Sequence, residues 1–158
     1  NVNGQTFYLS NMHPQINSFN AKVWATMEGR LRVWRDAITS KGGTMYVCKG
    51  GTIYDVTING KTQPGTLEKN PGTGASNENL RMPVPKYFFM AGVKKSATGF
   101  YSGMAFWAEH KPDNSSDLQR YMITINELEA RTGYDFFCNF PDNIEEGVEG
   151  YLEPTEWN

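Results

Sequence analysis

Four residues on one predicted helix have side chains that could do chemistry. Asn20, Trp24, Glu28 and Arg32 follow one another at steps of four, which on an α-helix gives a slowly drifting stripe along one side. Asn20 and Glu28 then lie ~12 Å apart along the axis and ~80° apart around it, so they can border one cleft without touching. Taken alone, Glu28 and Arg32 form an i,i+4 acid–base pair in the favourable order, a surface ion pair that contributes ~0.3–0.5 kcal/mol.

Apolar residues define the helix that must position this polar stripe. Their steps of three and four residues are typical of an amphipathic helix that faces a core, and they are Trp24, Met27, Leu31, Trp34 and Ile38. Ser18 is a suitable N-cap, and Gly42-Gly43 ends the pattern after a last turn that carries Lys41. The sequence therefore predicts one long helix over residues 19–41.

The polar stripe belongs to a longer pattern that begins before the helix. After a strand-like stretch at residues 6–9, fixed intervals separate Asn11, Pro14-Gln15, Asn20, Trp24, Glu28 and Arg32. This pattern resembles that of the DNA/RNA non-specific endonucleases, the ββα-metal nucleases that include the endonuclease G type enzymes. Residues 125–137, a short helix followed by Thr-Gly and an aromatic pair, are similar to the C-terminal signature of the same family. The resemblance therefore covers most of the chain.

The resemblance implies a role for each residue of the motif. Asn20 would be the protein ligand of a divalent cation, Mg²⁺ with Mn²⁺ as a possible substitute. Glu28 would orient metal-bound water, Arg32 would hold phosphate or support Glu28, and Asn11 and Gln15 would shape the site beneath the metal. Mg²⁺ prefers oxygen ligands and keeps most of its waters, so a single amide oxygen is a chemically reasonable anchor.

One part of the family pattern does not occur in this sequence. The general base of the family is a His in an Asp-Arg-Gly-His segment that precedes the motif, and no such segment is present here. His13 lies within the turn before the helix and His110 at a predicted strand end, and we expect both to be structural or solvent-facing. The resemblance therefore implies the C-terminal bulk of a longer enzyme, with the metal side of an active site and impaired or absent activity on its own.

Composition and charge narrow the class of protein. A chain of 158 residues with 39% hydrophobic and 13% aromatic content favours one globular domain over residues 1–158. No apolar run reaches the ~20 residues of a membrane span, and the formal net charge of −2 argues against a generally basic nucleic-acid binder. An enzyme that contacts a few phosphates needs only a local positive patch, which is predicted at Arg30, Arg32, Arg35, Lys94 and Lys95.

The remaining segments predict strands and turns rather than a helical bundle. Strand-like runs at residues 44–49 and 52–58 are separated by Lys49-Gly50-Gly51, which indicates a hairpin, and residues 85–94 and 102–109 predict a second hairpin. Residues 61–83 lack any period and indicate a long loop, a candidate flap near substrate. Thr124, with Glu127 at capping-box spacing, starts a short helix that ends near Gly133. We expect an α+β fold, with a mostly antiparallel sheet and the long active-site helix packed against it.

Two cysteines allow two interpretations. Cys48 and Cys138 both follow apolar residues, which favours buried free thiols. A disulfide between them is the alternative, and it would indicate an oxidising compartment.

The resemblance implies a metal-dependent endonuclease that hydrolyses phosphodiester bonds of DNA and RNA with little sequence preference. Its partners would be DNA and RNA, with a homodimer possible, and a secreted or periplasmic location is suggested by the family alone. Two alternatives remain open at this point. One is a nucleic-acid-binding protein that does not cleave, and the other is an aromatic-rich β module that binds glycans or proteins.

Overall fold

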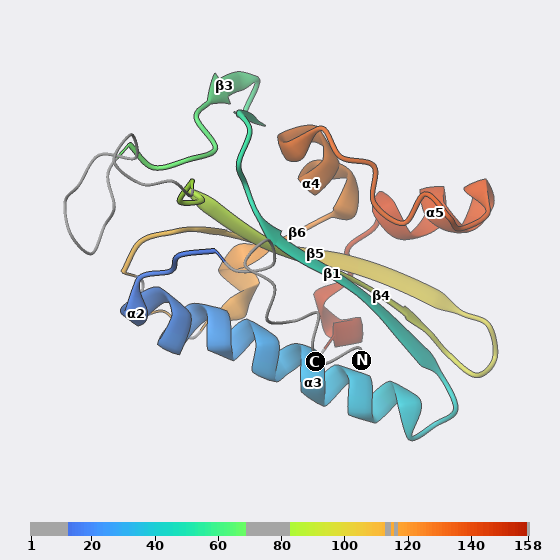
Figure 1. The fold of residues 1–158 in the computed structure, drawn as a ribbon. Helices are drawn as coiled ribbons and strands as arrows, with labels where there is room; N and C mark the ends of the chain where they lie inside the picture. Colours follow the sequence, from blue (N-terminus) through green and yellow to red (C-terminus); the bar gives the residue numbers. More distant parts are fainter. Residues whose placement is uncertain (1–12, 69–82, 113–114, 116, 158) are drawn as a thin grey trace, which may run out of the picture.

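The computed structural model describes residues 13–68, 83–112, 115 and 117–157 (Figure 1). The strand expected at residues 6–9, the site residue Asn11 and most of the predicted flap lie outside the described residues. The helices and strands, in chain order, are α2 (Asn17–Phe19), the π-helical turn η2 (Asn20–Trp24), α3 (Ala25–Thr39), β1 (Thr44–Gly51), β2 (Val56–Ile58), β3 (Lys61–Gln63), β4 (Tyr87–Lys95), β5 (Tyr101–Glu109), η4 (Leu118–Tyr121), β6 (Met122–Ile123), α4 (Ile125–Thr132), α5 (Asp142–Glu149) and η5 (Pro154–Trp157).

An antiparallel sheet of order β1-β4-β5-β6 forms the middle layer of the molecule. The predicted hairpin β4–β5 is its centre, paired from Tyr87 opposite Glu109 to Lys95 opposite Tyr101. Figure 1 shows α3 along one face of this sheet and α4 and α5 on the other. The α+β prediction, with a mostly antiparallel sheet and a long helix packed against it, is confirmed.

Alternation along the central strands produces one core on each face of the sheet, because successive strand residues point to opposite sides. The core on the α3 face contains Phe19, Val23, Trp24, Met27, Leu31, Phe88, Met90, Met104, Phe106, Ala108, Tyr121 and Trp157. The core on the other face contains Val56, Tyr87, Phe89, Ala91, Val93, Ala105, Trp107, Ile125, Leu128, Phe136 and Val148. Each large apolar side chain buried in this way stabilises the fold by roughly 1.5–3 kcal/mol.

The long helix starts and ends close to the predicted positions, but its predicted N-cap is wrong. Helical structure begins at Asn17, so Ser18 lies inside the helix and the N-cap residue is Ile16, which offers no capping side chain. The C-terminal stop is the predicted glycine pair. Gly42 takes a φ of +78° and the Gly43 N–H donates to the Ile38 carbonyl at 2.9 Å, which satisfies a carbonyl at the end of the helix.

The predicted first hairpin is wrong. β1 runs through the presumed turn to Gly51 and pairs with β4, far away in the sequence. The neighbouring strand β2 pairs instead with β3, inside the segment predicted to be a loop. Asn59 and Gly60 make the turn with φ values of +52° and +71°, the left-handed conformations that an Asn-Gly hairpin turn requires. Asn59-Gly60 is a stronger hairpin signal than Gly50-Gly51, because Asn-Gly is a preferred sequence for a two-residue hairpin turn.

The C-terminal third follows its local signals. Thr124 caps α4 by accepting a hydrogen bond from the Glu127 N–H at 3.0 Å, and the helix ends at Gly133 with φ +71°. Both features were predicted. Cys48 and Cys138 are free thiols, as the favoured interpretation predicted, and the alternative disulfide does not form. The predicted burial is wrong, because both residues are exposed.

Helices long and apolar enough to cross a bilayer do not occur in the part of the chain that the structure describes.

Candidate functional site

A π-helical turn interrupts the long helix at the residue expected to bind metal. The Ala25 N–H donates to the Asn20 carbonyl five positions back, and the Thr26 hydroxyl donates to the Lys22 carbonyl at 2.7 Å. Such a turn accommodates one extra residue without ending the helix. Asn20 and Glu28 are therefore related as residues seven apart on a regular helix, which places them about 20° apart around the axis instead of ~80°. The two polar side chains emerge on nearly the same side.

The same turn separates Trp24 from the polar stripe. Trp24 is buried in the α3-face core, stacked 6.1 Å from Phe19 and edge-on to Phe88, while the small, exposed Ala25 follows Asn20 on the outer side. The predicted four-step stripe of Asn20, Trp24, Glu28 and Arg32 is therefore wrong at Trp24. Asn20 and Arg32 are exposed and Glu28 is half-buried, so all three reach the surface of this face.

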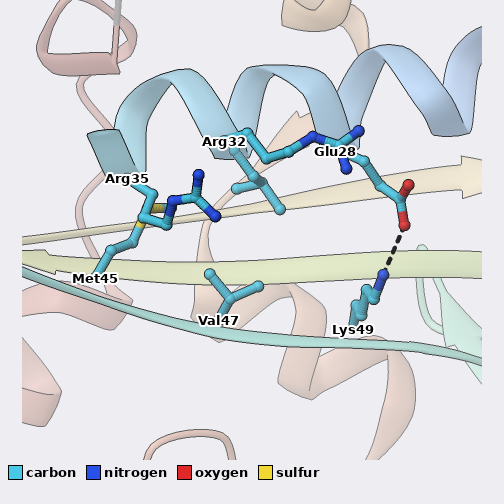
Figure 2. Close-up of a pocket in the computed structure, with 7 residues that line it drawn as sticks. Glu28, Arg32, Arg35, Met45, Val47 and Lys49 are labelled. Atoms are coloured by element: carbon cyan, nitrogen blue, oxygen red, sulfur yellow. Dashed lines mark hydrogen bonds and ion pairs between the residues drawn. The ribbon is translucent and has the colours of Figure 1, made fainter. Parts of the chain in front are cut away.

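Glu28 pairs with a residue that the motif did not include. Its Oε1 accepts a hydrogen bond from Lys49 Nζ at 2.6 Å, an ion pair that joins α3 to strand β1 (Figure 2). Within the described residues the expected pair between Glu28 and Arg32 does not form. The Glu28 side chain is 26% exposed and Lys49 54% exposed, so the pair lies at the surface and positions the carboxylate more than it stabilises the fold.

A groove of about 200 Å³ runs beside this ion pair between α3 and β1. Apolar and charged side chains line it, namely Glu28, Leu31, Arg32, Arg35, Met45, Val47 and Lys49. Figure 2 shows the Arg35 guanidinium between α3 and Val47 of β1, whereas the Arg32 side chain extends along α3 toward Glu28. Three cations and one carboxylate therefore line an apolar-floored groove, which favours an anionic ligand such as phosphate.

Alternation along β1 explains why Lys49 reaches this groove. Met45, Val47 and Lys49 are two residues apart, so they share the face of the strand that points at α3. The two-residue spacing of Met45, Val47 and Lys49 is visible in the sequence, but a hairpin interpretation of this segment does not show that Lys49 faces the helix.

His110 fixes the start of the helix that carries Asn20. The Ile16 N–H donates to His110 Nε2 at 2.9 Å, and His110 Nδ1 lies 2.8 Å from the Pro85 carbonyl, to which it must donate. The ring is therefore the neutral Nδ1–H tautomer, packed edge-on to Phe19 at 5.1 Å. Burial lowers the pKa of His110, which favours this neutral form. His110 is structural and buried, and both its ring nitrogens are engaged.

His13 and Gln15 lie in the segment just before the helix, and both are half-buried. The His13 ring lies edge-on to Phe88 with centroids 6.3 Å apart, and burial lowers its pKa. Gln15 immediately precedes Ile16, whose N–H is bound by His110. The hydrogen bond from Ile16 to His110, which directly follows strand β5, therefore also fixes the backbone position of Gln15.

The five residues of the predicted positive patch do not lie together, and only Arg32 and Arg35 line the same groove. Arg35 lines the groove and also pairs with Asp36 at 2.7 Å, whereas Arg30 is exposed and lines a second depression beside Trp34. Lys94 lies 4.5 Å from the Trp157 ring on the α3 face. Lys95, the next residue along β4, points to the opposite face and lies 5.4 Å from the Tyr101 ring.

The donor set at this site fits a hydrated hard cation. Asn20 offers an amide oxygen and Glu28 a carboxylate, and neither is a soft ligand. Across the described residues, the group of three or more His, Cys, Asp or Glu side chains close enough to share an ion lies elsewhere in the fold. A cation here would have few protein ligands, as Mg²⁺ accepts when it keeps its waters.

Comparisons with known proteins agree with this geometry. The chain is 30% identical over 136 residues to a nuclease of Syncephalastrum racemosum, covering 84% of this chain and 41% of that protein. It is 27% identical over 138 residues to the mitochondrial endonuclease G of Homo sapiens, covering 85% and 42%. A nuclease of Serratia marcescens is 23% identical, with 87% and 46% covered. The chain thus spans somewhat less than half the length of these curated relatives.

A solved structure shares the fold. A chain in the crystal structure of an EndoG/EndoGI complex superposes with a TM-score of 0.64 at 24% identity, covering 89% of this chain and 54% of that one. The antiparallel sheet with its long helix is therefore the ββα-metal nuclease fold. A family model described as DNA/RNA non-specific endonuclease matches residues 1–143. The resemblance drawn from the motif is confirmed, and the chain belongs to the DNA/RNA non-specific endonuclease family.

Proposed function

We propose that residues 1–158 form one nuclease domain that carries the metal and phosphate side of an active site cleaving DNA and RNA. The observation that carries this proposal is the π-helical turn η2, which brings Asn20 round to the side of Glu28. A regular helix would hold the two polar groups ~80° apart. Departures of this kind are frequent at functional sites, and this one lies on the motif shared with the family.

Each residue of the site has a task that follows from its position. Glu28 would accept hydrogen bonds from water bound near Asn20 and so orient it, with its carboxylate held by Lys49 at 2.6 Å. Arg32 binds the phosphate of the substrate, with Arg35 adding positive charge further along the groove. Mg²⁺, or Mn²⁺ in its place, would be held by Asn20 and would supply Lewis-acid polarisation of the phosphoryl oxygens.

Low sequence preference follows from the kind of contact this groove offers. Arg32, Arg35 and Lys49 are suited to phosphate oxygens, which are the same at every position of a nucleic acid. The groove floor of Leu31, Met45 and Val47 offers no hydrogen-bonding side chains with which to read base edges. DNA and RNA are therefore both expected substrates.

The chain is proposed to be impaired as a nuclease on its own. His110 has both ring nitrogens engaged in the fold, so it has no free nitrogen with which to deprotonate water. This observation favours a second candidate function, binding of nucleic acid without cleavage. The family match argues against the glycan- or protein-binding alternative.

Digestion of plasmid DNA and of RNA with Mg²⁺ tests the proposal. Three proteins are compared: the chain as printed, the same protein extended upstream along its gene, and the extended protein with Glu28→Gln. We expect cleavage by the extended wild type and a loss of at least ~100-fold in the variant. Asn20→Ala is expected to abolish the Mg²⁺ dependence together with the activity.

The outcomes separate the two candidate functions. Cleavage by the extended wild type alone supports the nuclease. Binding of nucleic acid without cleavage at either length supports the second candidate, and equal cleavage by wild type and Glu28→Gln would contradict the site assignment.

A further inference from the structure

Three carboxylates from separate segments converge on the face of the sheet opposite α3. Glu129 belongs to α4, Asp135 to the loop that follows it, and Glu149 to the end of α5. One oxygen from each lies within 4.8 Å of the other two. This acidic cluster is on the other side of the sheet from Asn20 and the groove (Figure 1), so the proposed active site does not use it.

Glu149 is the buried member of the acidic cluster. The residue is only 8% exposed, and its Oε1 is buried without a hydrogen-bond partner among the described residues. No Lys, Arg or His of the described chain forms an ion pair with Glu129, Asp135 or Glu149. A buried carboxylate with an unpaired oxygen and two carboxylate neighbours is strongly unfavourable unless a cation or a proton compensates it.

The surrounding fold holds these groups together. Glu129 Oε1 accepts a hydrogen bond from the Phe136 N–H at 2.7 Å, which fixes the backbone next to Asp135. Phe136 in turn packs edge-on against Phe89 of the sheet, with centroids 5.4 Å apart. These contacts fix the Glu129 carboxylate and the backbone next to Asp135.

Helix α5 is equally constrained by close contact with the sheet. A Cβ built on Gly103 of strand β5 would lie 2.3 Å from the Val148 carbonyl oxygen, so the helix backbone nearly touches the strand. Glu149 follows Val148 directly, so the same contact positions its backbone. The backbone that carries the donors is thus held in place before any ligand arrives, which lowers the cost of binding one.

The titration behaviour agrees with uncompensated negative charge. Burial, repulsion from Glu129, Glu145 and Asp135, and a side-chain hydrogen bond with Glu129 together raise the pKa of Glu149 to about 7, while Glu149 Oε1 remains without a partner in the described chain. Burial and repulsion from Asp135 and Asp142 also raise the pKa of Glu145, whose Oε1 is a second buried oxygen without a partner in the described chain.

We propose that Glu129, Asp135 and Glu149 form a second divalent-cation site, of the Ca²⁺ class, that clamps α4, its following loop and α5 together. The donors are all oxygens, which disfavours Zn²⁺ and other soft-ligand metals. Oxygens bound to Ca²⁺ at ~2.3–2.6 Å can be up to ~5 Å apart, whereas the ~2.0–2.1 Å of Mg²⁺ limits them to ~4.2 Å. The three oxygens lie within 4.8 Å of one another, a spread that the longer Ca²⁺–oxygen distance accommodates more readily than the shorter Mg²⁺–oxygen distance.

Thermal unfolding with and without Ca²⁺ tests this proposal. At pH 7.5 in KCl, millimolar Ca²⁺ is expected to raise the melting temperature of the wild-type protein by roughly 5 °C, since only the folded state holds the site. Calorimetric titration with Ca²⁺ should show one such site. Glu149→Gln is expected to remove the response, and Asp135→Asn at an exposed position should do the same without disturbing the core.

Two matched variants serve as controls. Glu146→Gln removes the same charge from an exposed position of α5 outside the acidic cluster and should keep the full Ca²⁺ response. Asn20→Ala should also keep it, which separates this site from the cation proposed for the nuclease. The inference is independent of the proposed function and can fail while that function stands.

Three results would overturn the proposal. The first is a wild type whose melting temperature and heat of titration do not respond to Ca²⁺. The second is an unchanged response in both Glu149→Gln and Asp135→Asn. The third is an equal loss in Glu146→Gln, which would indicate general charge screening. A higher melting temperature for Glu149→Gln, with no Ca²⁺ response in wild type, would show that the carboxylates share a proton instead.

Discussion

At the scale of single residues, Lys49 is the clearest addition to the motif. It holds Glu28 from the neighbouring strand, a contact between residues 21 positions apart in the sequence. Without the ammonium group, Glu28 loses its fixed position but keeps its charge. We expect Lys49→Met to lower cleavage by the extended protein about tenfold while weakening DNA binding only slightly. Lys61→Met on β3 is the control, and an equal loss there would contradict the role given to Lys49.

His110 is expected to matter for stability rather than for chemistry. His110→Phe keeps an aromatic ring against Phe19 but leaves the Ile16 N–H and the Pro85 carbonyl without partners. We expect it to lower the free energy of unfolding by about 2–4 kcal/mol, measured by urea denaturation. The half-buried His13→Phe should cost under about 1 kcal/mol. Equal effects of the two substitutions would remove the special role of His110.

At the scale of elements, the π-helical turn η2 makes a geometric prediction. Deleting the exposed Ala21 removes the extra residue, so a regular α-helix can form in which Asn20 and Glu28 are seven positions apart and stay about 20° apart around the axis. Cleavage by the extended protein should therefore stay within about threefold of wild type, and helix content by circular dichroism and the melting temperature should change little. A loss of ~100-fold or more with normal helix content would show that the extra residue does more than align these two side chains.

Gly103 is a second element-scale constraint, because α5 lies directly on it. Gly103→Ala places a methyl group 2.3 Å from the Val148 carbonyl oxygen and 2.9 Å from Ile125 Cδ1. It is expected to destabilise the fold by about 1–3 kcal/mol in denaturant titration. Gly147→Ala, in the same helix with open space around it, should instead stabilise by about 0.5–1 kcal/mol. The opposite signs distinguish close packing from a general effect of replacing glycine.

How far the sequence predicts these elements depends on whether the determining contact is local. The periodicity of Met27 and Leu31, the cap at Thr124 and the stop at Gly133 are local signals, and the structure follows them. The π turn accompanies the packing of Trp24 against Phe88, and the partners of β1 residues in β4 are 37 to 51 positions away in the sequence. Local propensity carries no information about either. Lys49 could be predicted in part. Alternation along β1 predicts that its side chain points to the same side of the strand as Met45 and Val47, but not that it pairs with Glu28.

At the scale of the whole molecule, stability is expected to vary with pH through opposing shifts, raised carboxyl pKa values at Glu149 and Glu145 and lowered imidazole pKa values at His110 and His13. The pKa of Glu149 is raised to about 7 from a usual 4.5, so its contribution is fully present below about pH 4.5 and is lost as the pH rises through 7. The pKa of His110 is lowered from 6.5, so its contribution is present above pH 6.5 and is lost as the pH falls. The pH dependence of the wild-type free energy of unfolding combines these contributions, so it does not show by itself which residue causes which part.

The difference between wild type and Glu149→Gln isolates the first group. In the absence of divalent cations, the variant should gain stability relative to wild type between pH 4.5 and 7.5, by about 2 kcal/mol at the upper end. Free energies of unfolding from urea titrations at several pH values measure this difference. A difference that stays constant with pH would show that Glu149 titrates normally.

The hydrogen bond from Ile16 to His110 also bears on the order in which the protein folds. It joins residues 94 positions apart, whereas the backbone hydrogen bonds of the helix that it anchors join residues four positions apart. Helical turns form fast, but closing a loop of this length is expected to follow the pairing of β4 and β5, which carries His110 into place. The helix that carries Asn20 is thus expected to dock late, so assembly of the proposed catalytic surface completes folding rather than beginning it.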